Sequence, residues 1–103
     1  MENCVFCKIV KGEIPRKLEY EDDDVVAFYS NKPAAEVHLL IVPKKHVSTF
    51  MDLDDRILDM TKAAQKIIKD KNLLSGYRLI INGGNNQEVP HVHLHLLAGK
   101  IDS

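Results

Sequence analysis

Three short runs of apolar and β-branched residues in the first half of the chain predict strands. Residues 17–21 and 25–30 form two of these runs, and the acidic segment 21–24 between them indicates a hairpin with a solvated tip. The third run, 37–42, is closed by Pro43 and suits a buried strand. Three strands joined by short links are therefore expected in this half of the chain.

The spacing of apolar residues also predicts two helices. A short one is expected within residues 4–12, where apolar positions recur at helical spacing and Gly12 can end the helix. A longer helix follows Asp54, which can cap it, and ends near Asn72 with lysines in its last turn. Its expected apolar stripe consists of Ile57, Leu58, Thr61, Ala64, Ile67 and Ile68.

The second half of the chain is expected to end in two strands. The run YRLIIN, residues 77–82, predicts one strand, and a polar glycine-rich loop follows at 83–88. The last strand is expected over 89–99, with Pro90 near its start, where a missing backbone donor is best tolerated. Short links between these elements favour an α+β fold, an antiparallel sheet of about five strands with one long and one short helix.

Three of the five histidines occupy alternate positions in the run HVHLHLL, residues 91–97. Side chains at i, i+2 and i+4 of a strand leave the same face of the sheet. A regular strand would therefore place His91, His93 and His95 side by side and turn Val92 and Leu94 toward the core. We expect one face of this strand to carry chemistry and the other to carry packing.

Three interpretations of this histidine row stand side by side. The rings could be exposed polar residues without a shared role. They could hold a catalytic metal ion, although parallel side chains on one straight strand converge poorly on a tetrahedral ion. They could also act on phosphorus, because neutral imidazole, with an ordinary pKa of about 6.5, is a nucleophile near pH 7 without a separate base. The neighbouring rings and the loop 83–88 would then supply donors to the phosphoryl oxygens.

Composition and charge narrow the function classes. A chain of 103 residues fits one domain, 1–103, and its 45% of hydrophobic and 28% of charged residues are typical of a folded protein. The net charge of −1, with no basic block longer than Lys44-Lys45, argues against a nucleic acid duplex as partner. The N-terminal run MENCVFCKIV contains no long apolar segment, so we expect no signal peptide, no membrane span and a cytoplasmic location.

The only two cysteines, Cys4 and Cys7, have C-x-x-C spacing. In a cytoplasmic protein they are expected to be free thiols or metal ligands in preference to a structural disulfide. A redox role is less favoured because no strand precedes the pair. The spacing supplies half of a zinc site, which requires two further ligands.

The run QEVPHVHLHLL resembles the signature of the histidine triad (HIT) superfamily, His-x-His-x-His followed by two apolar residues. The segments FCKIVKGEIP, EDDDVVAFYSNKPAAEVHLLIVPKKHVS and GYRLIINGG are similar to blocks of its Hint branch, the nucleoside phosphoramidate hydrolases. The resemblance covers nearly the whole chain, and the triad run is highly specific when joined to HLLIVPKKH. It implies the HIT fold and a bacterial type of Hint-like protein.

The resemblance also implies roles for individual residues. His93 matches the central histidine, which attacks the α-phosphorus and forms a covalent nucleotidyl-histidine intermediate that water resolves. His95 matches the histidine that contacts phosphate oxygens, and His91 the one that helps to orient the nucleophile. Asn82 matches an asparagine that hydrogen-bonds near the phosphate. The remaining matched residues are Gln87 in the neighbouring loop, His38 behind the triad, and Phe6, Ile9 and Phe28 in an apolar purine pocket, although the last three could equally be core residues.

Two positions depart from the pattern of the family. Where Hint-like proteins usually carry an aspartate that holds the ribose hydroxyls, this chain has Ser30, followed by Asn31. Where many carry a serine before the triad that helps the leaving group, it has Glu88. The resemblance therefore leaves ribose binding and leaving-group selectivity open.

Many bacterial members complete the zinc site with the histidine of the PKKH block and the first triad histidine. The matching residues here are His46 and His91, so the resemblance implies a structural Zn²⁺ held by Cys4, Cys7, His46 and His91. Such an ion would tie the N-terminal helix to the histidine strand and would take no part in the chemistry.

The expected function is hydrolysis of a purine nucleoside 5′-phosphoramidate of the AMP or GMP type. Two alternatives stand beside it: hydrolysis of dinucleoside polyphosphates, and a non-catalytic nucleotide-binding regulatory module. The resemblance further implies a homodimer that pairs through the long helix and the adjacent strand. The exposed edge of so small a sheet is consistent with such pairing.

Overall fold

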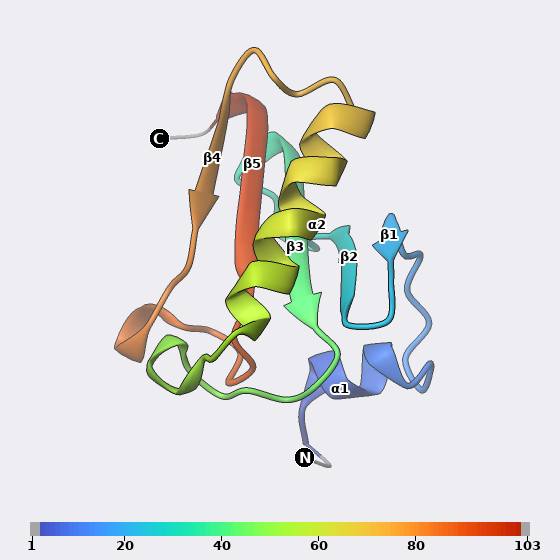
Figure 1. The fold of residues 1–103 in the computed structure, drawn as a ribbon, viewed down its shortest axis with the longest axis vertical. Coiled ribbons are helices and arrows are strands. Elements are labelled where there is room, and N and C mark those ends of the chain that lie inside the picture. Colours follow the sequence, from blue (N-terminus) through green and yellow to red (C-terminus); the bar gives the residue numbers. More distant parts are fainter. Residues whose placement is uncertain (1–2, 102–103) are drawn as a thin grey trace.

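The computed structural model describes residues 3–101 and has the expected α+β architecture, with one short helix, one long helix and a single antiparallel sheet (Figure 1). No helix in this range is long and apolar enough to cross a membrane. In chain order the elements are α1 (Val5–Val10), β1 (Tyr20–Glu21), β2 (Val25–Tyr29), β3 (Ala35–Pro43), the 3-10 turn η1 (Phe50–Asp52), α2 (Arg56–Asp70), β4 (Tyr77–Ile80), the 3-10 turn η2 (Gly84–Asn86) and β5 (Leu94–Ile101).

The five strands lie in the order β1-β2-β3-β5-β4, and every neighbouring pair is antiparallel. The central pair is β3 and β5, in which Leu39 lies opposite Leu96 and Leu40 lies opposite His95. Strand β4 pairs only with β5, so one of its edges is open within the described chain. The histidine-bearing end of β5 is thus held in the interior of the sheet.

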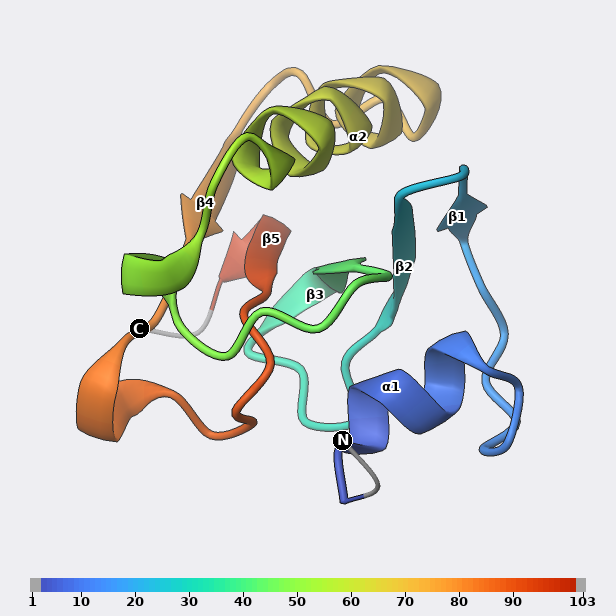
Figure 2. The same cartoon turned by 60° about the horizontal axis from the view of Figure 1, so that its bottom comes forward.

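The two faces of the sheet are covered by different helices (Figure 2), with α2 over one face and α1 beneath the other. Alternation along the strands divides the buried side chains accordingly. The cluster under α2 contains Val25, Ala27, Leu39, Ile41, Leu94 and Leu96 from the strands. The cluster under α1 contains Phe6, Ile9, Val26, Phe28, Leu40 and Val42.

Helix α1 begins and ends with identifiable local interactions. Cys4 is its N-cap, and its Sγ accepts a hydrogen bond from the backbone N–H of Cys7 at 3.4 Å. The chain leaves the helix through Gly12, whose φ of +79° lies in the left-handed region that favours glycine. Between these ends Phe6 and Ile9 are buried, and the Phe6 ring packs edge-on against Phe28. This contact anchors the short helix on the face of the sheet opposite α2.

The stripe predicted for α2 is wrong in its first turn. Leu58 is 56% exposed, whereas Met60 is fully buried and Ala63 joins the core, so the buried stripe is Met60, Ala63, Ala64, Ile67 and Ile68. The helix starts one residue later than a cap at Asp54 would imply: Asp55 is the N-cap, while Asp54 Oδ1 accepts a hydrogen bond from the Arg56 N–H. The buried face of α2 is rotated from the predicted one because packing against the sheet determines it, and local periodicity carries no information about that packing.

The end of α2 near Asn72 is as predicted. Asn72 has a φ of +57°, its N–H donates to the Lys69 carbonyl, and the Leu73 N–H donates to the Ile68 carbonyl at 2.8 Å. These two bonds satisfy carbonyls that would otherwise be orphaned at the helix end, and they form a Schellman motif.

Two strand predictions were too long at their N-terminal ends. Strand β1 contains only Tyr20 and Glu21, not residues 17–21. Strand β5 begins at Leu94, so His91 and His93 lie in the extended segment before it and only His95 belongs to the paired strand. The segment containing His91 and His93 leaves the ladder because the Val92 N–H donates to the Val47 carbonyl, in the β3–α2 connection.

The observed buried face of α2 predicts how two substitutions change the free energy of unfolding. Met60→Ala should lower the free energy of unfolding by about 2–5 kcal/mol because it opens a cavity beneath α2. Leu58→Ala, which shortens an exposed side chain of the same helix, should change it by less than about 0.5 kcal/mol. Chemical denaturation of both variants measures these values, and a larger loss for Leu58→Ala would contradict the observed rotation of the helix.

Candidate functional site

The face of the sheet under α1 gathers the histidines. His95 from β5 and His38 from β3 point to this face, and their ring centroids are 5.2 Å apart. The ring of His93 lies 4.8 Å from that of His95 and packs edge-on against Phe6 at 5.1 Å. Of the row predicted by alternation, His93 and His95 lie side by side although β5 begins after His93, whereas the His91 ring faces Cys4 and His46 instead.

A backbone carbonyl fixes the tautomer of His93. Nδ1 of His93 lies 2.8 Å from the carbonyl oxygen of His91, and this oxygen can only accept. The proton of the neutral ring is therefore on Nδ1, and Nε2 carries a free lone pair. His93 is 6% exposed and lines a hollow in the protein surface, so this lone pair is available to a ligand there.

A backbone amide fixes the tautomers of the next two rings. The Ala34 N–H donates to His38 Nδ1 at 3.0 Å, so the proton of neutral His38 is on Nε2. His38 Nε2 lies 2.9 Å from His95 Nδ1 and donates to it, which places the His95 proton on Nε2. His95 thus presents an N–H donor toward the hollow, while His93 presents a lone pair.

The side-chain amide of Asn82 stands next to this donor, with its Nδ2 3.2 Å from His95 Nε2. A half-turn of the amide about its last bond presents Oδ1, which accepts the Nε2 proton. Asn82 follows β4 and is half-buried. It therefore lies beside the His95 donor.

Burial keeps these rings neutral. It lowers the pKa of His93 and of His38 below the usual value of 6.5. For His95, burial, with smaller contributions from His93 and His38, lowers the pKa to about 4. The neutral tautomers that the hydrogen bonds select are therefore the populated forms at pH 7.

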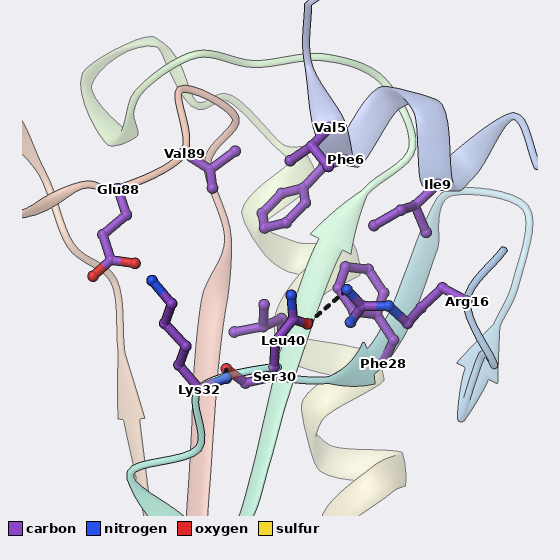
Figure 3. A pocket seen from close by; sticks show the side chains of 11 residues that line it. Val5, Phe6, Ile9, Arg16, Phe28, Ser30, Lys32, Leu40, Glu88 and Val89 are labelled. Carbon is purple, nitrogen blue, oxygen red and sulfur yellow. Dashed lines mark hydrogen bonds between the residues drawn. The ribbon is translucent and has the colours of Figure 1, made fainter. Parts of the chain in front are cut away.

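Two hollows adjoin on this face and form one continuous groove. The first is lined by Ala34, His38, Asn82, His93 and His95, and the second by Val5, Ile9, Arg16, Phe28 and Asn31. Both are also lined by Phe6, Ser30, Lys32, Leu40, Glu88 and Val89. Figure 3 shows the second hollow, with the Phe6, Ile9 and Phe28 side chains gathered around it. The groove thus joins a polar histidine end to an apolar end.

The predicted substrate-binding residues fall differently along this groove. Phe6, Ile9, Phe28, Ser30, His38 and Glu88 line it. Gln87 does not: its side-chain amide donates to the carbonyls of Ser48 and Val89 and ties the loop 83–88 to the β3–α2 connection. A role for Gln87 in binding a ligand stays a prediction, and its observed contacts are those of a loop anchor.

Sequence reasoning assigned no role to three polar or charged groove residues, namely Arg16, Asn31 and Lys32. Arg16 lies in the connection between α1 and β1, where no periodicity or motif marks it. Its guanidinium donates to the Tyr29 carbonyl at 2.8 Å and to Asn31 Oδ1 at 2.7 Å. Only the packing of this connection against the end of β2 brings Arg16 to the groove.

A second group of side chains, next to Phe6, has donor atoms suited to a metal ion. The ligand atoms of Cys4, Cys7, His46 and His91 all lie within 4.8 Å of one another. Cys4 Sγ is 3.3 Å from His91 Nδ1, and Cys7 Sγ is 3.3 Å from His46 Nδ1. Both cysteines are free and buried.

The hydrogen bonds of His91 prepare it as a ligand. His91 Nε2 donates to the Pro43 carbonyl at 2.8 Å, which leaves the lone pair on Nδ1, the atom that faces the thiols. A carbonyl partner on the second ring nitrogen is the usual arrangement for a metal-binding histidine. Burial raises the pKa of the Cys7 thiol to about 11, so a thiolate there requires a cation close by.

The spacing of the four donor atoms fits a tetrahedral ion. Zinc bonds of about 2.3 Å to sulfur and about 2.0 Å to nitrogen place neighbouring sulfur and nitrogen ligands about 3.5 Å apart. The observed sulfur–nitrogen distances are 3.3, 3.3 and 3.5 Å. A two-sulfur, two-nitrogen donor set also suits zinc. These four residues could therefore hold a metal ion with only small adjustments.

Known proteins are similar to this chain in sequence. The profile of the HIT domain matches residues 11–101. A HIT-like protein of Methanocaldococcus jannaschii is 41% identical over 99 residues, which cover 91% of this chain and 77% of that protein.

Solved structures extend the similarity to three dimensions. A histidine triad protein from Clostridium difficile superposes with a TM-score of 0.93 at 43% identity and covers 97% of this chain and 93% of its own. A HIT family hydrolase from Legionella pneumophila gives a TM-score of 0.90 at 43% identity, with 95% of this chain and 94% of its own covered. With the family profile spanning nearly all of the described residues and the histidine row in place, the chain belongs to the HIT domain family.

Proposed function

We propose that this chain is a hydrolase of purine nucleoside 5′-phosphoramidates that works through a covalent nucleotidyl-histidine intermediate on His93. The observation that carries the proposal is the 2.8 Å hydrogen bond from His93 Nδ1 to the His91 carbonyl, which leaves Nε2 as a lone-pair donor in the groove. The similar hydrolase from Legionella pneumophila supports hydrolytic chemistry.

The reaction follows from the two tautomers. His93 Nε2 attacks the α-phosphorus and forms a P–N bond to the ring, while the bond from phosphorus to the leaving amine breaks. The Nε2–H of His95 donates a hydrogen bond to a phosphoryl oxygen in place of Asn82. The departing nitrogen, which is a poor leaving group otherwise, takes up a proton from water in the groove, and the water that attacks in the second step gives a proton back. Water then attacks phosphorus, the bond to His93 breaks, and the nucleoside monophosphate is released.

The groove can hold the other parts of such a substrate. With phosphorus at the histidine end, the sugar lies along the shared residues Ser30 and Lys32, and the base lies among the apolar side chains of the second hollow. Phe6 and Phe28 offer flat apolar surfaces for a purine. The groove thus supports nucleotide binding as well as attack on phosphorus.

Replacing the proposed nucleophile tests the chemistry. His93→Ala should lower turnover of adenosine 5′-phosphoramidate by about 10³-fold or more, because no other lone pair occupies its place. The variant should still bind AMP, and the covalent adenylate detected by mass spectrometry in quenched wild-type reactions should disappear.

A matched variant separates chemistry from folding. His93→Asn can keep the hydrogen bond to the His91 carbonyl through its amide N–H but lacks the nucleophilic ring. It should be as inactive as His93→Ala. Retained turnover in either variant would refute the assignment of His93, and hydrolysis of dinucleoside polyphosphates in preference to phosphoramidates would favour the alternative substrate class.

We also propose that Cys4, Cys7, His46 and His91 hold a structural Zn²⁺. When bound, the ion cross-links the start of α1, the β3–α2 connection and the segment before β5. Its chemistry there is to stabilise two thiolates and the fold. His93 keeps its own hydrogen bond to the His91 backbone, so the ion holds the nucleophile in place without touching it.

Removal of the thiols tests the metal. The double variant Cys4→Ser, Cys7→Ser should lose bound zinc and melt at a lower temperature, because the cross-link is gone, while keeping substantial phosphoramidase activity. Elemental analysis of the wild type should give about one zinc per chain. A wild type that is purified without metal, and whose melting temperature does not respond to added zinc, would exclude the site.

The third proposal is a homodimer that forms across the open edge of β4. Strand β4 has no partner on this edge within residues 3–101, and its side chains Tyr77, Leu79 and Ile80 are each more than one third exposed. An unpaired apolar edge is a template for pairing with a second chain. A second copy of this chain satisfies the edge by extending the sheet through a two-fold axis.

Sedimentation measures this assembly directly. The wild type should sediment as a species of twice the chain mass of 11.7 kDa, and Leu79→Lys should shift it to the monomer because the charge is desolvated in the interface. A monomeric wild type at micromolar concentration would contradict the dimer.

A further inference from the structure

The apolar end of the groove contains a cation that neither the proposed chemistry nor the packing of the core uses. Arg16 lines the second hollow only, and its guanidinium lies 5.0 Å from the centre of the Phe28 ring. Figure 3 shows this guanidinium turned into the hollow, opposite the Phe6 side chain. It is thus placed to touch whatever occupies the apolar end.

The hydrogen bonds of Arg16 orient the guanidinium and leave it unsaturated. One donor goes to the Tyr29 carbonyl and one to Asn31 Oδ1, both of which are neutral oxygens. A guanidinium has five N–H donors in a fixed plane, so three remain. No carboxylate of residues 3–101 lies within ion-pair distance of Arg16.

The carboxylate that lines the groove lies on the side away from Arg16. Glu88 is the one carboxylate among the residues that line the two hollows, and in Figure 3 it extends toward Lys32, away from Arg16. On the side of Arg16 the second hollow therefore offers hydrogen-bond donors and a positive charge, and its one carboxylate, Glu88, lies on the opposite side.

We infer that Arg16, held by Asn31, reads the edge of the base and makes this chain select 6-oxopurine nucleotides, the guanine and hypoxanthine type, over adenine nucleotides. This inference deepens the proposed function and rests on it for the position of phosphorus at the histidine end. Guanine and hypoxanthine present two acceptors, O6 and N7, on one edge, and an arginine fork matches this pair. Adenine places an amino group, a donor, where O6 would be.

Contacts with Phe28 and Asn31 explain how Arg16, although partly exposed, can distinguish a 6-oxopurine from adenine. The ring of Phe28 supports the guanidinium from below, and Asn31 Oδ1 fixes its rotation, so little conformational freedom is lost when a base binds. The apolar walls of Val5, Phe6 and Ile9 exclude water from one side of the contact. When adenine binds, an N–H of Arg16 faces the adenine amino group and has no acceptor, which costs free energy. When a 6-oxopurine binds, O6 accepts this hydrogen bond and the cost does not arise.

The test compares three substrates that differ only at the base. Guanosine, inosine and adenosine 5′-phosphoramidates are assayed with the wild type, and the ratio of kcat/KM for each oxopurine to that for adenosine is measured. The ratio should be roughly 5- to 100-fold for both guanosine and inosine. Inosine lacks the 2-amino group of guanosine and all three bases carry N7, so equal ratios assign the selection to the 6-position of the base.

Three variants locate the selection in Arg16. Arg16→Met keeps the stem over Phe28 without donors or charge, and both ratios should fall to about one. Arg16→Lys keeps the charge but loses the fork, and the ratios should fall partway. Lys17→Met removes a neighbouring cation that does not line the groove and should leave the ratios unchanged.

The outcomes separate this inference from the proposed function. Equal kcat/KM for the three substrates in the wild type, or ratios that persist in Arg16→Met, overturn the role of Arg16 while leaving the hydrolase intact. If none of the three is hydrolysed, the proposed function fails. Calorimetric binding of GMP, IMP and AMP to wild type and Arg16→Met then decides the inference, and equal affinities overturn it.

Discussion

Burial of the imidazole rings is the constraint on which the rest of the site depends. A ring nitrogen taken out of water must find a partner, and here the partners are backbone groups: the Ala34 N–H for His38 and the His91 carbonyl for His93. Each of these groups can only donate or only accept, so each fixes where the proton of a neutral ring lies. Packing that excludes water thereby selects one lone pair and one N–H donor for the groove.

The segment before β5 couples this chemistry to the cysteines. The backbone oxygen of His91 holds the His93 ring, while the side chain of the same residue faces Cys4 and hydrogen-bonds to the Pro43 carbonyl. Phe6 packs edge-on against both His91 and His93. Only one residue and one aromatic contact therefore separate the thiols from the proposed nucleophile.

Much of the fold follows from local patterns. The order of helices and strands, the hairpin tip at 21–24 and the end of α2 near Asn72 were predicted correctly, because turn residues and periodicity act over a few positions. The buried stripe of α2 and the start of β5 were predicted wrongly. Both depend on contacts with distant segments: the face that α2 turns to the sheet, and the bond from Val92 to Val47 that draws the chain out of the ladder.

The candidate site, like the fold, has features that local sequence predicts and features that depend on contacts between distant segments. By itself, the sequence determined that His93 and His95 lie side by side, because alternation is a property of any extended chain, and its resemblance to one family named residues that gather around them. Only the tertiary structure decided which nitrogen of each ring is free and placed Arg16 at the apolar end of the groove. The physical reason is the distance along the chain: His38 and His95 are 57 positions apart and Pro43 and His91 are 48 apart, and no local pattern encodes a hydrogen bond between them.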